Sequence, residues 1–348
     1  MKIYDNGLLS IENLMPTQLD MDRILTRRKL VVRKEQKDSL RRFEAGLVGE
    51  NTVVEYLKEY GRKHWVVLRN LWLNDFGACE CDVVLLTGIG IHTFEVKNYV
   101  GEFIYEKGTC TLNGQKIKHN CLSQAAKAQA TLREVCRKFS RNTPVSGALV
   151  FAGTDNDVEI RSPFDDVQVV ARSGLRKHIQ NIAHAEDNAH YTSTIDVQGI
   201  IQHLTNIAVP NPYIPTPLSK DEMASLWKGI CCANCGNFDV EIGRQYVTCP
   251  CGLHEPRDEA VIRTICEYGV LTYDQAMNRA DLLDFFGGDI SKHIFRKIMN
   301  KFFKCSYKNR YTTYQNFRLP YDKIKHFFVI DLPKILYINK KDYLLINS

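Results

Sequence analysis

Residues 91–101 read IHTFEVKNYVG, and this stretch decides how the residues around it are interpreted. Its first half is rich in β-branched and aromatic side chains, which favours a strand. Alternation along a strand places Glu95 and Lys97 on one face and Phe94 and Val96 on the other. The sequence therefore predicts an acid and a base that share one site at the end of an apolar strand.

The flanking sequence predicts a layered α/β core. Two further β-rich runs, residues 65–68 and 82–86, precede the strand and are separated from it and from each other by turn-forming Asn, Asp and Gly. Before them, apolar residues recur at helical spacing over residues 39–60. After them, good helix formers fill residues 122–139, and residues 145–151 form a continuous apolar run typical of a strand buried on both faces. The order is helix, three strands, helix, strand.

A chain of 348 residues is long enough for two or three domains. Four prolines between residues 209 and 218 cannot continue a helix, so we expect a domain boundary there. The predicted segments are an N-terminal basic extension (1–38), an α/β domain (39–208), a Pro-rich linker (209–224), a cysteine-rich module (225–256) and a C-terminal region (257–348).

Glu50 is a candidate site residue in the predicted first helix. It lies three residues after Leu47 and four before Val54, so it faces the core with them, and a carboxylate there needs a partner. Gly46 and Gly49 make most sense if another element packs closely against the helix backbone. A Glu at the solvent edge of the apolar stripe is the alternative interpretation.

Three carboxylates and one lysine thus come at the ends of elements that are adjacent in sequence, because Asp82 opens the strand before Glu95 and Lys97. Phosphodiester hydrolysis supplies a reason for this set. Mg²⁺ prefers hard oxygen ligands and usually takes one or two carboxylates, and a nearby lysine can orient the attacking water or stabilise developing negative charge. A structural ion pair between Glu95 and Lys97 is the alternative.

The spacing of these residues resembles a known family. The pattern is Gly46-x-x-Gly49-Glu50, then Glu80-Cys81-Asp82, then Phe94-Glu95-Val96-Lys97-Asn98-x-x-Gly101, then Gln124 opening an Ala-rich helix. It is similar to the nuclease-related domain, a family of the PD-(D/E)xK restriction-endonuclease-like superfamily, over roughly residues 40–150. Several motifs in the right order are more specific than any one of them.

The resemblance implies a restriction-endonuclease-like αβββαβ core and assigns roles to its residues. Asp82 and Glu95 would bind Mg²⁺ or Mn²⁺, and Lys97 would be the catalytic lysine. Glu50 would sit beside the metal, and Gln124 would face the site from the second helix. The implied activity is a metal-dependent nuclease.

Two features of the middle strand depart from this simple picture. Glu80 is either an additional acid of the site or a solvent-exposed residue, since alternation permits both. Cys79 and Cys81 stand where more ordinary strand residues are expected. This departure concerns the local strand and not the acids.

Five of the twelve cysteines lie between Cys231 and Cys251, which indicates a metal site. The arrangement Cys232-Ala-Asn-Cys235-Gly and Cys249-Pro-Cys251-Gly resembles a zinc ribbon, with four thiolates for a structural, tetrahedral Zn²⁺. The second pair is CxC where a ribbon usually has CxxC. Cys231 or His254 is therefore an alternative ligand, and free buried thiols are the alternative to a metal.

Basic residues are concentrated in two runs, although the net charge is only +6. From 291 to 318 there are eight Lys or Arg and no Asp or Glu, and from 21 to 42 nine basic residues accompany three acids. The run from 291 to 318 begins with an amphipathic helix and continues into interleaved aromatic and basic residues. This pattern suggests a small α+β region of winged-helix type. The predicted nucleic-acid contacts are Lys292, Arg296, Lys297, Lys301, Lys308 and Arg310. A solvated basic surface is the alternative.

The sequence as a whole predicts a Mg²⁺-dependent enzyme that cleaves DNA, with the ribbon and the basic region gripping the substrate. A regulatory or binding protein that keeps the nuclease fold without turnover is the second hypothesis, and an RNA-directed enzyme is the third. No window approaches the ~20 apolar residues of a membrane span, and the first residues lack a basic and apolar leader pattern. We expect a cytoplasmic protein without a membrane partner.

Overall fold

The computed structural model describes residues 2–5, 8–12, 16–29, 32–139, 142–189, 195–273, 275–307, 312–316, 318 and 320. Within these residues the chain forms two compact units. The first takes in the described residues up to 12 and from 42 to 210, and the second takes in those from 16 to 41 and from 211 onward.

The first unit is built on one mixed sheet. Its strands in spatial order are β1 (Lys2–Asp5), β2 (Leu8–Glu12), β3 (Val66–Leu73), β4 (Cys79–Leu86), β5 (Ile91–Lys97), β9 (Val145–Phe151) and β11 (Gln168–Ala171). β3, β4 and β5 pair antiparallel, whereas β5 with β9 and β9 with β11 pair parallel. β5 is thus hydrogen-bonded on both sides.

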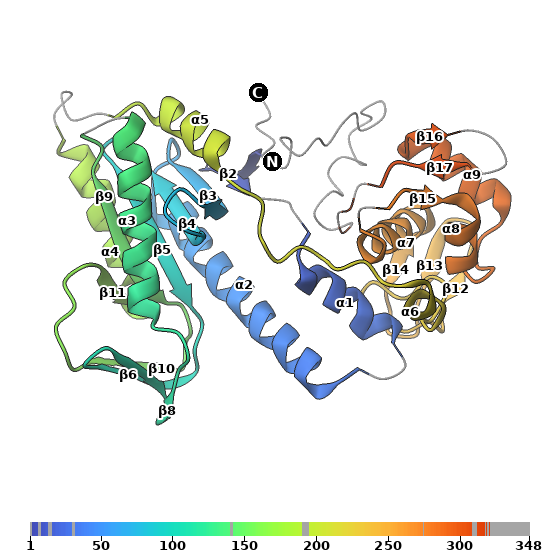
Figure 1. Cartoon of the computed structure of the whole chain (residues 1–348), viewed down its shortest axis with the longest axis horizontal. Coiled ribbons are helices and arrows are strands. Elements are labelled where there is room, and N and C mark those ends of the chain that lie inside the picture. Colours follow the sequence, from blue (N-terminus) through green and yellow to red (C-terminus); the bar gives the residue numbers. More distant parts are fainter. Residues whose placement is uncertain are drawn as a thin grey trace. The chain divides into compact units, whose positions relative to one another are not determined.

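Helices cover both faces of this sheet (Figure 1). α2 (Lys34–Tyr60) and α4 (Arg172–Asp187) enclose one apolar cluster, and α3 (Cys121–Phe139) and α5 (Val197–Ile207) enclose the cluster on the opposite face. Burial on both faces explains why β4 and β9 read as continuous apolar runs.

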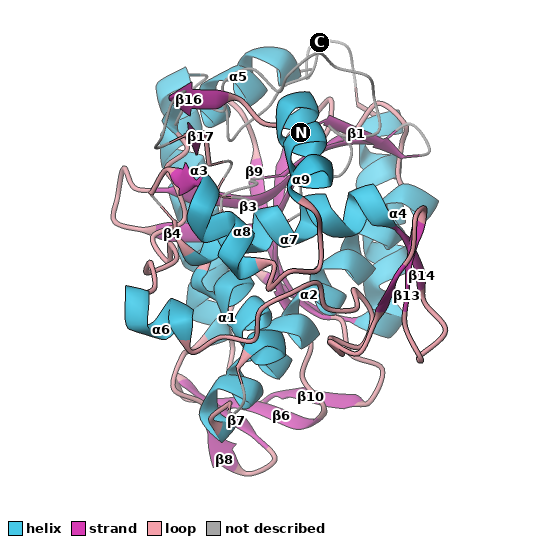
Figure 2. Ribbon diagram, turned by 90° about the vertical axis from the view of Figure 1, so that its right-hand side faces the viewer, coloured by secondary structure: helices cyan, strands magenta, loops and turns pink. Residues whose placement is uncertain are grey.

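A smaller sheet lies at one end of the first unit, away from β3 and β4 (Figure 2). Its strands are β10 (Asn156–Ile160), β6 (Gly101–Glu106), β7 (Thr109–Leu112) and β8 (Gln115–Lys116), in that order. β6 and β7 pair antiparallel as a hairpin. The parallel partner of β6, β10, comes from the loop after β9.

The α/β class predicted from the sequence is confirmed. The order helix, three antiparallel strands, helix and parallel strand is present as α2, β3, β4, β5, α3 and β9. The residues before position 39, predicted as a basic extension, form β1, β2, the helix α1 (Gln18–Arg28) and the start of α2. α1 belongs to the second unit.

The second unit combines a three-stranded ribbon with a small α+β arrangement. The ribbon contains β12 (Glu241–Ile242), β13 (Tyr246–Thr248) and β14 (His254–Pro256), and the short α6 (Lys220–Ala224) precedes it. After it come α7 (Arg257–Leu271), β15 (Met277–Asn278), α8 (Arg279–Phe285), α9 (Lys292–Phe302), β16 (Cys305–Tyr307) and β17 (Thr313–Tyr314). The last three strands form one sheet in the order β15-β17-β16. The winged-helix type predicted for this region stays a prediction.

Four buried charges join α1, the ribbon and α7. The Arg28 guanidinium is completely buried and donates to Glu267 Oε2 at 2.6 and 2.8 Å. Arg263 donates to both carboxylate oxygens of Glu255 at 2.8 and 2.9 Å and to Glu267 Oε1 at 3.0 Å. The two arginines also donate to carbonyl oxygens of Trp227, Gly229 and Cys231, the residues just before the cysteine cluster. Each buried charge therefore has an opposite charge and further hydrogen bonds.

Gly49 permits the close approach of α2 to the end of β5. A Cβ atom at this position would lie 2.9 Å from Asn98 Cβ and 3.3 Å from Val96 Cγ1. At Gly46, one turn earlier, a Cβ would meet nothing within 4 Å. The two helical glycines thus differ in a testable way.

We expect Gly49→Ala to destabilise the first unit by about 1–3 kcal/mol, because the methyl group would push α2 away from β5. Gly46→Ala should instead be neutral or stabilise by up to about 1 kcal/mol, since alanine is the better helix former. The measurement is the urea midpoint of each variant. Equal midpoints for the two variants would contradict the close contact at Gly49.

Candidate functional site

Glu95 and Lys97 lie together at the end of β5. The Lys97 ammonium donates to Glu95 Oε1 at 2.7 Å, and both side chains are largely buried. Desolvation opposes the charged ammonium, but the carboxylates of Glu95 and Asp82 outweigh it and raise the pKa of Lys97 above its ordinary value. Lys97 is therefore a fixed cation in this site.

Asp82 lies beside this pair from the neighbouring strand. Its Oδ2 accepts a hydrogen bond from the Val96 backbone amide at 2.8 Å, between the positions of Glu95 and Lys97. Burial raises the pKa of Asp82 well above its ordinary value, and the charges of Glu95 and Glu50 raise it further. The structure thus brings Asp82 together with Glu95 and Lys97 of β5. Asp82 was predicted to open its strand, but β4 begins at Cys79 and Asp82 lies in its middle.

Glu50 and Glu80 extend the acidic cluster. Glu50 Oε2 lies 3.6 Å from the Arg69 guanidinium of β3, and its charge acts on Asp82. Desolvation and then the Glu95 charge raise the pKa of Glu80 to about 7, and its side chain is exposed, as one of the two sequence interpretations expected. Arg69 was missed by the sequence argument, although a lone cation in the apolar run of β3 was a signal for it.

The cluster holds more negative than positive charge. Four carboxylates, those of Glu50, Glu80, Asp82 and Glu95, face the ammonium of Lys97 and the guanidinium of Arg69. Desolvation is the first cause of the raised pKa values of Asp82 and Glu80, and the neighbouring Glu95 charge raises both further. A divalent cation would relieve this excess.

The donor set fits a hard divalent cation with few protein ligands. Asp82 uses one carboxylate oxygen for Val96 and Glu95 uses one for Lys97, and the second oxygen of each accepts no hydrogen bond from a described residue. Within the described part of the chain, only a cysteine cluster brings three or more ligand atoms together. Two carboxylate ligands with water in the other positions is the usual protein site for Mg²⁺.

Gln124 takes a separate position. It lies in the first turn of α3, its side chain is exposed, and its backbone amide donates to the Asn120 carbonyl oxygen at 3.0 Å. Its predicted role at the site stays a prediction.

The four cysteines predicted as metal ligands converge in the ribbon. The sulfur atoms of Cys232, Cys235, Cys249 and Cys251 all lie within 4.8 Å of one another. The Cys232–Cys251 and Cys235–Cys249 sulfur distances are 3.6 and 3.5 Å. Tetrahedral Zn²⁺ with bonds of about 2.3 Å requires sulfur atoms about 3.8 Å apart, so this cluster could hold such an ion.

Neither alternative ligand belongs to the cluster. The Cys231 thiol is buried and receives a 3.8 Å contact from Arg263 Nη1, and His254 lies in β14. Gly236 and Gly252, which follow the two cysteine pairs, have φ values of +74° and +90°. These left-handed conformations suit glycine and make the turns that bring the CxC pair opposite the CxxC pair.

The cations predicted to contact nucleic acid lie on α9. Lys292, Arg296, Lys297 and Lys301 are all exposed there, whereas Phe295, Ile298 and Met299 are buried. Lys308 and Arg310 lie outside the described residues. α9 therefore presents one cationic and one apolar side, as its sequence predicted.

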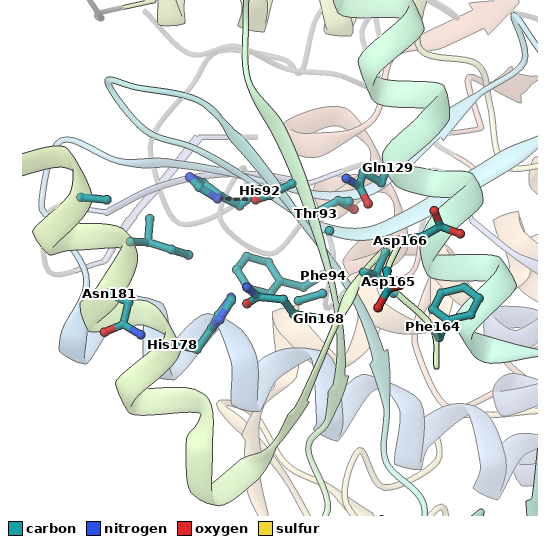
Figure 3. A pocket seen from close by; sticks show the side chains of 16 residues that line it. His92, Thr93, Phe94, Gln129, Phe164, Asp165, Asp166, Gln168, His178 and Asn181 are labelled. Carbon is teal, nitrogen blue, oxygen red and sulfur yellow. Dashed lines mark hydrogen bonds between the residues drawn. The ribbon is translucent and has the colours of Figure 1, made fainter. Parts of the chain in front are cut away.

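A polar cavity of about 540 Å³ lies near the other end of β5 (Figure 3). His92, Gln129 and Gln168 line it together with His178 and Asn181 of α4. His92 Nδ1 lies 2.8 Å from Ser146 Oγ. None of the predicted site residues lines this cavity, so it is separate from the carboxylate cluster.

Comparison with known proteins identifies the domain type of the first unit. Residues 45–152 match the family model described as the nuclease-related domain, which confirms the resemblance seen in the sequence. The match contains Glu50, Asp82, Glu95, Lys97 and Gln124. No curated protein matches the chain, and no solved structure matches it. No helix in the described part of the chain is both long and apolar enough to cross a lipid bilayer.

The contribution of His92 to the stability of the first unit should fall as the pH is lowered from about 6.5 toward 4, whereas the raised pKa values of Asp82 and Glu80 act in the opposite direction. Desolvation, and then the neighbouring His178, lower the pKa of His92 to about 4, so the folded chain binds fewer protons than the unfolded chain in this window. The full effect is about 3 kcal/mol or less. His92→Gln should remove this contribution, so that between pH 6.5 and 4 the variant gains stability relative to the native chain, measured by hydrogen exchange of β5 peptides across a urea series. His119→Gln, at an exposed histidine, is the control; equal slopes in both variants would exclude His92 as the cause.

Proposed function

We propose that the first unit is a metal-dependent nuclease that hydrolyses DNA phosphodiester bonds. The observation that carries this proposal is the convergence of Asp82, Glu95 and Lys97 on adjoining strands inside a nuclease-related domain. The excess of carboxylates over cations is a second support, because a plain Glu95–Lys97 ion pair needs no Asp82 beside it.

Each residue has a role in this reaction. The free oxygens of Asp82 and Glu95 would hold Mg²⁺ or Mn²⁺, with Glu50 beside the metal. Such an ion, when bound, polarises the phosphate and lowers the pKa of a coordinated water. Lys97 stays protonated between its carboxylates, so it would orient the attacking water or stabilise the negative charge that develops on the phosphate. Gln124 would contribute from α3.

The second unit would bind the substrate. Zn²⁺ in the four-cysteine cluster would hold the ribbon together without catalytic function, because four thiolates leave no open coordination position. The exposed cations of α9, Lys292, Arg296, Lys297 and Lys301, would contact the phosphate backbone, as Lys308 and Arg310 of the following segment would. A DNA-binding protein that keeps this fold without turnover is the alternative, and the complete set of acids with Lys97 speaks against it.

Cleavage assays with linear, circular and single-stranded DNA test the enzyme. We expect cutting with Mg²⁺ or Mn²⁺ but not with EDTA, and a loss of at least about 100-fold in Asp82→Asn and Lys97→Ala, since each removes a group needed in the transition state. Asp157→Asn, at an exposed carboxylate of β10, should cut like the native chain. Full activity in Asp82→Asn would refute the assignment, and binding without cutting by the native chain would favour the alternative.

Metal analysis tests the cysteine cluster. We expect about one zinc ion per purified chain, lost or strongly reduced in Cys235→Ser because three thiolates hold the ion less tightly than four. Cys231→Ser removes a neighbouring buried thiol outside the cluster and should keep its zinc. Zinc retained in Cys235→Ser but lost in Cys231→Ser would show that the ligand set is different.

A further inference from the structure

A second cavity of the first unit, of about 460 Å³, lies where α4 begins. The residues that give it chemical character are Tyr56, Tyr60, Thr154, Arg172, Ser173 and Arg176. Of the described residues that line it, none is acidic. Two guanidinium groups, three kinds of hydroxyl group and no carboxylate are the lining expected for an anion.

Both arginines are held in place without a carboxylate. Arg172 donates to the Ala152 carbonyl oxygen at 3.0 Å, and its guanidinium lies 6.0 Å from the centre of the Tyr56 ring. The Arg176 guanidinium lies 5.0 Å from the centre of the Tyr60 ring. Neither forms an ion pair with a described residue. Their positive charge is therefore oriented by aromatic faces and a backbone carbonyl, and it is not neutralised.

Glu59, the acid that precedes Tyr60 in the sequence, bonds to the tyrosine. Glu59 accepts a hydrogen bond from the Tyr60 hydroxyl, and this bond is the main reason that the pKa of Tyr60 is raised. Glu59 itself is exposed and does not line the cavity.

The cavity adjoins the backbone that carries Lys97. The Ala152 amide donates to the Lys97 carbonyl oxygen at 2.9 Å, and the Ala152 carbonyl oxygen receives the Arg172 bond. Gly153 lines the cavity and packs against the residues after Lys97, so closely that a Cβ there would lie 2.5 Å from the Tyr99 carbonyl oxygen. One short stretch of backbone thus joins the cavity to the candidate catalytic centre.

We propose that this cavity binds a backbone phosphate of the nucleic-acid strand that the carboxylate cluster would cleave, at a distance from the cleaved phosphate along the same strand. Arg172 and Arg176 would bind its oxygens through charge-assisted hydrogen bonds, and the hydroxyls of Thr154 and Ser173 would complete the set. The inference rests on the proposed nuclease function and specifies how that site holds its substrate. It makes Arg172 and Arg176 positioning residues that set which bond reaches the carboxylates.

Binding titrations separate this proposal from the enzyme assignment. The probes are fluorescein-labelled DNA oligonucleotides, single-stranded and duplex, titrated with the full chain in Ca²⁺ over a range of salt concentrations. Arg176→Gln should weaken binding about tenfold and make the slope of log K against log[salt] shallower by about 0.7 for single strands or 0.9 for duplex, the loss of one phosphate contact. Arg176→Lys should keep the slope because it keeps the charge.

Lys177→Gln is the matched control. Lys177 is exposed on the same helix, carries the same charge and does not line the cavity. It should bind with the native affinity and slope, and Arg296→Gln in the same titration reports on α9 separately.

A scan with single neutral methylphosphonate linkages provides a measurement that does not depend on comparing stabilities of variants. At one position in the strand, the neutral linkage should weaken DNA binding by the native chain but not by an Arg172→Gln, Arg176→Gln double variant. The proposal would be overturned if Arg176→Gln bound DNA with the native affinity and salt slope and if no linkage position weakened binding by the native chain. This holds even if Mg²⁺-dependent cleavage is intact. Weakened binding with no cleavage would support the phosphate site and count against the enzyme, and no binding by the native chain would overturn both.

Discussion

The first unit is organised around a carboxylate, that of Asp82, which is half-buried next to Glu95 and held by the Val96 amide of the neighbouring strand. Burying like charges side by side is costly, and the cost is sustained only where the surrounding backbone cannot relax. β5 meets this condition, because it is paired on both sides by β4 and β9 and is packed by α2 at Gly49. The rigid strand keeps the groups close, and the electrostatic strain makes the place suitable for a cation.

Buried ion pairs and the cysteine turns connect the elements of the second unit. Arg28 comes from α1, 239 residues before Glu267, and supplies the charge that Glu267 needs in order to stay ionised and buried. Arg263 links the same carboxylate to Glu255 and to the Cys231 carbonyl oxygen. The cysteine turns are therefore anchored to α7 and α1 by hydrogen bonds that do not depend on metal. An ion in the cluster would fix the turn geometry on a base that is already ordered.

The sequence sufficed for those parts of the fold that depend on local periodicity. Two-residue alternation placed Glu95 and Lys97 on one face, and the continuous apolar run of β9 indicated a buried strand. Non-local pairings were not predictable: the parallel pairing of β10 with β6, the addition of β1 and β2 to the main sheet, and the ion pair of Arg28 with Glu267 join segments whose own sequences carry no signal of a partner. Arg69 and the arginine cavity were missed for the same reason, since each depends on residues of another element that the fold brings next to it.

The distribution of arginines in the first unit carries more information than the net charge. Arg62, Arg137 and Arg161 are each paired with a nearby carboxylate, of Asp187, Glu134 and Glu159 respectively. Exposed ion pairs of this kind contribute little to stability, so pairing is easily gained or lost at a surface. A pair of guanidinium groups placed in a cavity that lacks acids is therefore a more selective arrangement than an ordinary basic surface. That cavity adjoins the backbone of Lys97, so the anion that it selects would lie at the same end of β5 as the candidate catalytic centre.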